Sequence, residues 1–171
     1  MKAKLKNFFL YFLIAFLICC NSVSYHQVAM ETPYKMIALE DSLNSLGLTK
    51  KNQDALALAH KKVAIMHLKG KNYTNARAHF SKVLKYSTFD SIAQYNILMI
   101  DGHLLRRTGN KEKLWDAIEI YYKAGRLYPN NGEPYFFIGK AYQNLDRNDF
   151  DLILESYQKA LQLELLKPLK D

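Results

Sequence analysis

A spacing of large, small and aromatic residues near the C-terminal end constrains the fold more than any other feature of this chain. Positions four and three residues apart share one face of a helix. The first set follows that spacing, and it consists of Tyr135, Ile138, Gly139 and Tyr142. A second set, Tyr157 and Ala160, comes shortly afterwards. Because Gly139 has no side chain, a second helix can approach closely there while the aromatic residues fill the flanking space. The pattern therefore predicts two helices that pack tightly against each other.

The same pattern occurs twice more upstream. The second-helix part recurs as Ala117, Tyr121 and Ala124 followed by Pro129, and again as Ala76, Phe80 and Val83. Twelve residues separate Ala64 from Ala76, and 22 separate Ala117 from Gly139. Together these intervals give 34 residues, which is the period of the tetratricopeptide repeat, a unit of two helices. The chain thus resembles the tetratricopeptide repeat family.

This resemblance implies an all-α fold in which about three helix-turn-helix repeats form a short right-handed superhelix. The repeats are predicted at residues 57–87, 95–129 and 132–166, within a repeat domain of residues 57–167. Polar, loop-like segments account for the longer intervals between them. The resemblance assigns packing between the two helices of each repeat to Ala64, Ala76, Phe80, Gly102, Ala117, Tyr121, Ala124, Tyr135, Gly139, Tyr142, Tyr157 and Ala160.

The N-terminal segment has the pattern of an export signal. Three lysines precede an unbroken apolar run of 11 residues, Phe8–Ile18, which is too short to span a bilayer. The cysteine pair that follows resembles a bacterial lipoprotein signal, with cleavage after residue 19 and lipidation, for example with palmitate, of Cys20. A plain secretory signal and an uncleaved anchor are the alternatives. The resemblance predicts a protein tethered to a bacterial envelope membrane, facing the periplasm or the cell exterior.

Residues 20–31 are polar and are predicted to form a tether. A capping helix is predicted over residues 32–47, because Thr32 can cap a helix that Pro33 begins. Its apolar residues recur at helical spacing and are Met36, Leu39, Leu43 and Leu46. The end of a repeat array has an apolar face that needs cover. We therefore expect this helix to cover the first repeat, and a docking helix for a partner is the alternative.

In tetratricopeptide repeats the first helices line a groove, so the resemblance also implies a binding site. At the corresponding positions stand Lys61, Ile65, Lys69, Met99, His103, Arg106, Arg107, Phe136 and Lys140. The basic residues among them could receive an acidic or C-terminal carboxylate segment of a protein or peptide partner. Ile65 stands where family members that grip a terminal carboxylate carry Asn. A solvated basic face is the alternative.

Composition and motifs argue against several other classes of function. Removing residues 1–19 removes three lysines and no acidic residue, so the formal charge falls from +8 to +5. Both cysteines lie in the signal region, so the exported domain is predicted to contain no disulfide. The five histidines match no His-Glu-x-x-His metal pattern, and neither a glycine-rich phosphate loop nor a nucleophile elbow is present. We therefore predict no catalytic residue, no metal, no cofactor and, because of the export signal, no nucleic-acid partner.

The sequence thus predicts a non-enzymatic scaffold that acts as an adaptor or assembly factor of an envelope complex. Two alternatives remain. Leucines of the last helix, Leu154, Leu161 and Leu165, would be uncovered if no further helix follows, which favours a self-associating structural subunit that dimerises through the C-terminal helix. A secreted module that captures peptides is the other alternative.

Overall fold

The computed structural model describes residues 24–146 and 149–163 of the chain. Within these ranges the chain is all-α, as predicted, and contains no β-strand. The helices are α2 (Tyr25–Glu31), α3 (Pro33–Ala38), α4 (Glu40–Leu46), α5 (Lys50–Lys69), α6 (Tyr73–Tyr86), α7 (Ser91–Arg107), α8 (Lys111–Leu127), α9 (Glu133–Leu145) and α10 (Phe150–Gln162). None of these helices combines the length and the apolar composition that crossing a bilayer requires.

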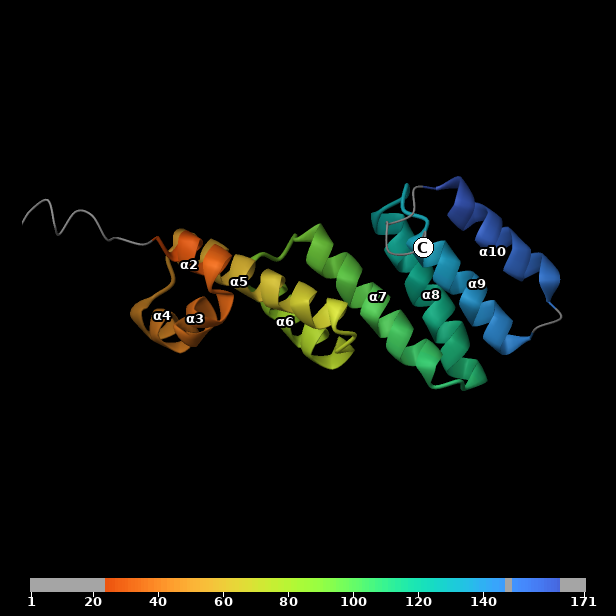
Figure 1. Cartoon of the computed structure of the whole chain (residues 1–171), viewed down its shortest axis with the longest axis horizontal. Coiled ribbons are helices and arrows are strands. Elements are labelled where there is room, and N and C mark those ends of the chain that lie inside the picture. Colours follow the sequence, from red (N-terminus) through yellow and green to blue (C-terminus); the bar gives the residue numbers. More distant parts are fainter. Residues whose placement is uncertain (1–23, 147–148, 164–171) are drawn as a thin grey trace, which may run out of the picture.

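From α5 onward the helices pack as successive antiparallel pairs along the long axis of the molecule (Figure 1). The pairs are α5 with α6, α7 with α8, and α9 with α10. Side chains of Thr49, Asn72, Asp90 and Asn110 accept hydrogen bonds from the first-turn amides of α5, α6, α7 and α8. Such caps satisfy amides that have no partner within the helix. The tight turns inside the first two pairs place Lys71 and Gly109 at positive φ.

Two apolar clusters form the core, and α7 contributes to both. The first cluster contains residues of α2 to α6 together with Ala93 and Ile100 of α7. The second contains residues of α7 to α10, among them Tyr95 and Met99 of α7. Because α7 buries two different faces, it connects the first helix pair to the second. Burial of such side chains is the main favourable term in folding.

Two glycines allow the helices within a pair to approach closely. A Cβ at Gly102 would stand 2.4 Å from the ring of Tyr121, and a Cβ at Gly139 would stand 2.7 Å from the ring of Tyr157. Both distances are far below van der Waals contact, so only glycine fits while the rings keep their positions. The aromatic side chains of α8 and α10 thus lie directly over the backbone of α7 and α9.

Polar contacts also connect neighbouring pairs. Arg77 of α6 donates two hydrogen bonds to the carboxylate of Asp101 on α7, at 2.5 and 3.0 Å. Further along, the Tyr95 hydroxyl of α7 donates to Glu133 at the start of α9 at 2.6 Å. Burial raises the pKa of Glu133, which the Tyr95 hydrogen bond opposes. These bonds fix the register between one helix pair and the next.

The N-terminal part differs from the sequence-based prediction. The described part of the predicted tether, from Tyr25 onward, is helix α2, which packs on α5 and buries Ala29 completely. The single capping helix predicted over 32–47 is two short helices, because the chain turns at Leu39. The buried residues of the two helices are Met36 in α3 and Glu40 and Leu43 in α4, while the predicted core residue Leu46 is 83% exposed. Residues 1–23, which include Cys20, and residues 164–171, which include Leu165, lie outside the described residues.

Candidate functional site

A row of aromatic rings connects all three helix pairs, and it includes His103 and Phe136, two of the predicted groove residues. Phe137 of α9 is its centre. The Phe137 ring lies 4.3 Å from that of His103 on α7, 5.7 Å from Tyr121 on α8 and 5.3 Å from Phe136. His103 continues the row to Tyr73 of α6 at 5.3 Å, and Phe136 continues it to Tyr157 of α10 at 5.7 Å. Aromatic contacts at these separations add to the stability that burial alone provides.

Three cations lie on this row of rings. The Arg106 guanidinium stands 5.6 Å from the centre of the Phe137 ring, and Arg107 stands 6.0 Å from that of Tyr73. The Lys140 ammonium stands 5.7 Å from the centre of the Phe136 ring. Positive charges over ring faces are attracted by the quadrupole of the ring. We call the three cations with Tyr73, Phe136 and Phe137 the cation–aromatic surface.

The cations of this surface have no acidic partner in the part of the chain that the structure describes. In addition, Nε of Arg106 is buried and makes no hydrogen bond there. A buried N–H without an acceptor is costly. The positive charge of the cation–aromatic surface is therefore not neutralised by an acidic residue within the described residues.

The other predicted groove residues are placed differently. Lys61 forms an ion pair with Asp90, the cap of α7, so its charge is already used within the chain. Met99 and His103 are only 4% and 8% exposed, which differs from the prediction that their side chains line a groove. Ile65 and Lys69 are exposed on α5 and do not belong to the cation–aromatic surface.

His103 is buried beneath the cation–aromatic surface and contacts the rings of Phe137 and Tyr73. Its Nδ1 lies 2.8 Å from the Tyr121 hydroxyl, and both side chains are buried. Burial, together with the nearby charge of Arg106, lowers the pKa of His103 to about 4. The imidazole is therefore neutral at neutral pH, so it adds no charge to the face. Burial likewise raises the pKa of Tyr121, which nearby Arg106 opposes.

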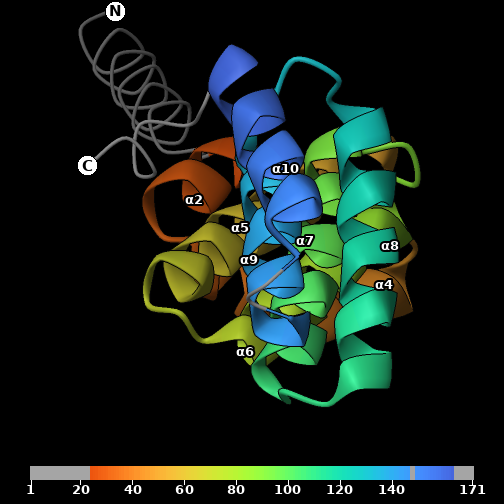
Figure 2. The ribbon, with the colours of Figure 1, turned by 90° about the vertical axis from the view of Figure 1, so that its right-hand side faces the viewer.

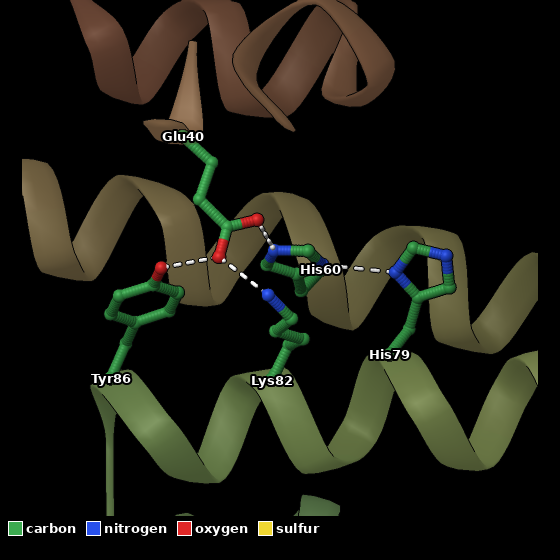
Figure 3. A network of polar contacts seen from close by, with 5 residues as sticks. All are labelled: Glu40, His60, His79, Lys82 and Tyr86. Atoms are coloured by element: carbon green, nitrogen blue, oxygen red, sulfur yellow. Dashed lines mark hydrogen bonds and ion pairs between the residues drawn. The ribbon is translucent and has the colours of Figure 1, made fainter. Parts of the chain in front are cut away.

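A second polar cluster lies between the N-terminal segment and the first helix pair (Figure 3). Its centre is the carboxylate of Glu40 on α4, and this residue is 8% exposed. The carboxylate accepts hydrogen bonds from Tyr86 at 2.5 Å, Lys82 at 2.9 Å and His60 Nε2 at 3.1 Å. Nδ1 of His60 lies 2.9 Å from Nδ1 of His79. The cluster therefore attaches α4 to both helices of the first pair.

The protonation states in this cluster follow from its geometry. Burial alone would raise the pKa of Glu40, but hydrogen bonds from Tyr86 and Lys82 and the charges of His60 and Lys82 lower it to about 2. Burial lowers the pKa of His60 and of His79. A neutral His60 that donates through Nε2 must accept at Nδ1, so His79 donates from its own Nδ1. If both rings were protonated, two N–H groups would point at each other across 2.9 Å.

Sequence reasoning missed this cluster, although a signal was present. Met36, Glu40 and Leu43 have the spacing of one helical face, so Glu40 stands at a position that faces the core. A single acidic residue on an apolar face indicates a buried carboxylate that needs partners. His60, one of these partners, is itself only 2% exposed.

Comparison with known proteins identifies no family for this arrangement. No protein-family model matches the chain, and no curated protein matches it. Within the described ranges, no group of three or more His, Cys, Asp or Glu side chains is placed to hold a metal ion.

Proposed function

We propose that this chain is a non-enzymatic scaffold that binds an acidic segment of a partner protein on its cation–aromatic surface. The observation that carries the proposal is that Arg106, Arg107 and Lys140 lie over aromatic rings without any acidic partner among the described residues. Carboxylates form strong, charge-assisted hydrogen bonds with such groups. Aromatic side chains and arginine are also enriched among the residues that dominate the energy of protein interfaces.

We further propose that the three helix pairs are tetratricopeptide-like repeats of a right-handed superhelix. The placement of Tyr121 over Gly102 and of Tyr157 over Gly139 supports this interpretation. In this proposal the export signal leads to lipidation of Cys20, and the protein acts as an adaptor or assembly factor at a bacterial envelope membrane. Cys20→Ala should then abolish acyl labelling and release the protein from membranes. Unchanged labelling would contradict the assignment of the anchor.

Charge reversal tests the binding surface. The variant carries Glu at Arg106, Arg107 and Lys140, and the control carries Glu at Lys35, Lys51 and Lys111, which are exposed and make no ion pair with any described residue. Both changes alter the net charge equally. Partners would be captured by cross-linking in cells, and their binding affinity would then be measured with purified proteins. Each exposed charge pair contributes roughly 0.2–1 kcal/mol, so for three pairs we expect binding to weaken about 3- to 150-fold in the variant only.

The outcome is informative in either direction. If the variant and the control retain the same partner with equal affinity, binding occurs elsewhere and the proposal is wrong. If both lose it equally, the partner responds to net charge rather than to this surface, which also contradicts the proposal. Far-UV circular dichroism of both proteins would show whether the fold is intact.

A further inference from the structure

Helix α10 is the last helix of the described residues and lies at one end of the molecule, facing the viewer in Figure 2. An apolar stripe runs along its exposed side. Three of its members are largely exposed: Phe150 is 69%, Leu154 is 56% and Leu161 is 76% exposed. Tyr157, at the edge of the stripe, is partly exposed. Consecutive members are three or four residues apart, so they share one face of the helix. A contiguous exposed apolar face of this kind marks an interaction site.

Most of the corresponding positions in the two earlier helix pairs contact the next helix. Aligning the helices on Phe80, Tyr121 and Tyr157 places Leu114, Ile118 and Gly125 of α8 at the three exposed positions. All three are buried, and the Tyr135 ring of α9 lies 3.3 Å from where a Cβ of Gly125 would stand. In α6 the same alignment gives Tyr73, Arg77 and Leu84. Arg77 binds Asp101 of α7, and Tyr73 contacts His103 and Arg107 of α7. The stripe of α10 is therefore the face that receives a further helix elsewhere in this chain.

The spacing of the stripe is symmetrical, so the stripe can pair with a second copy of itself. Phe150 and Leu161 are equally far from the midpoint between Glu155 and Ser156, and so are Leu154 and Tyr157. We propose that two copies of this chain associate through antiparallel pairing of their α10 helices about a twofold axis at this midpoint. Phe150 then packs against Leu161 of the second copy, and Leu154 packs against Tyr157 of the second copy. A twofold interface requires this kind of self-complementary patch.

The polar residues beside the stripe agree with this arrangement. On one flank, Asp151 comes near Gln158 of the second copy, whose amide can donate to the carboxylate. The 13-residue helix is about 20 Å long, so the interface lies at or below the lower end of the standard size, about 1,200 Å². We therefore expect a dimer that dissociates in the micromolar range.

Disulfide trapping tests both the contact and its direction. The full-length chain would carry serine at Cys19 and Cys20, which are its only cysteines, and would be studied in mild detergent. Phe150→Cys chains with one tag would be mixed with Leu161→Cys chains with another tag and oxidised. The expected result is a disulfide between the two tags, at a yield at least about tenfold above that of the control. The control is Glu155→Cys in both chains. In the antiparallel pair the two copies of residue 155 lie at almost the same height along the helix axis, but on the polar face.

Three results of the trapping experiment would overturn the proposal. The first is a Phe150–Leu161 disulfide yield no higher than that of Glu155→Cys. The second is a dominant disulfide between two Phe150→Cys chains, which would indicate parallel pairing. The third is a trapped product that forms equally well when the chains also carry Leu154→Glu. Sedimentation of the same full-length protein gives a second readout. The parent should dimerise between about 5 and 200 μM, Leu154→Glu should remain monomeric, and Lys159→Glu should behave as the parent. A parent that is monomeric throughout that range would also overturn it.

Discussion

The contact between Gly102 and Tyr121 leads to a sharp prediction about stability. In Gly102→Ala the new Cβ would stand 2.4 Å from one ring atom of Tyr121 and 2.8 Å from two others. Reaching an ordinary separation of 3.4 Å or more requires a shift of about 1 Å. The ring cannot swing aside freely, because Tyr121 is completely buried and its hydroxyl contacts His103. Either α7 and α8 must separate or the ring must leave its rotamer.

The net effect combines two opposing terms. Overpacking of a core costs typically about 1–3 kcal/mol. Replacing glycine by alanine inside a helix returns about 0.8–1 kcal/mol through helix propensity. Because the contact is so short and its partner so constrained, we expect the upper part of the overpacking range. Gly102→Ala should therefore destabilise the domain by about 1–2 kcal/mol.

Gly70→Ala is the matched control, because a Cβ there would meet only ordinary contacts at 3.6 Å. Gly70 has a negative φ of −78°, so alanine adopts its conformation and should stabilise by about 0.4–1 kcal/mol. Urea unfolding of residues 20–171 with Cys20→Ser, followed by circular dichroism, would measure both. The two variants should differ by about 2 kcal/mol, or about 4–8 °C in Tm. If Gly102→Ala unfolds at or above the midpoint of Gly70→Ala, the argument from close packing is wrong.

Two further predictions concern the cluster around Glu40. Burial lowers the pKa of His60 and His79 below the ordinary value of 6.5, so their contribution is complete above pH 6.5 and declines as the pH falls. Glu40, lowered from 4.5 to about 2, adds a second decline below pH 4.5. The urea concentration at the unfolding midpoint should thus decrease as the pH is lowered from 7 to 3. His79→Gln should make the part of this decrease just below pH 6.5 less steep, whereas His26→Gln, at an exposed site, should not. Parallel curves for the parent and His79→Gln would contradict this. Glu40→Ala leaves the Tyr86 hydroxyl and His60 without their acceptor and should destabilise by at least about 2 kcal/mol, measured against Asp41→Ala; equal midpoints would show that the cluster does not hold α4.

The all-α fold class could be predicted from the sequence because the spacing of its large, small and aromatic residues has one main origin, the packing of helices. Large, small and aromatic residues recur at helical spacing wherever two helices pack closely, and polar segments separate them. The approximate limits of the helix pairs follow from the same pattern, although α5 begins at Lys50 rather than at residue 57. Helix propensity alone would not have set these limits, because helix stability in proteins comes mainly from the packing of one face.

The N-terminal segment was predicted less well because its structure depends on distant residues. Residues 25–31 are polar enough to suggest a tether, yet α2 is helical because Ala29 packs on α5. In α3 and α4, apolar spacing selected Leu39 and Leu46, whereas the structure buries Glu40. Its position is favourable only because Tyr86, Lys82 and His60, between 20 and 46 residues away, supply donors. No local pattern contains that information.

The predicted binding residues also depend on partners that the local sequence does not reveal. Some of these residues nevertheless lie together in the structure. Lys61 and Arg106 were equivalent as basic residues in the sequence, but in the structure Lys61 is paired with Asp90 and Arg106 lies over Phe137. An ion pair neutralises a charge, whereas a ring face attracts a cation and leaves its hydrogen-bond donors without an anion. Aromatic support thus holds Arg106, Arg107 and Lys140 in place and keeps their charge available. This difference is the physical reason to expect an acidic partner at the cation–aromatic surface rather than along the whole row of predicted basic residues.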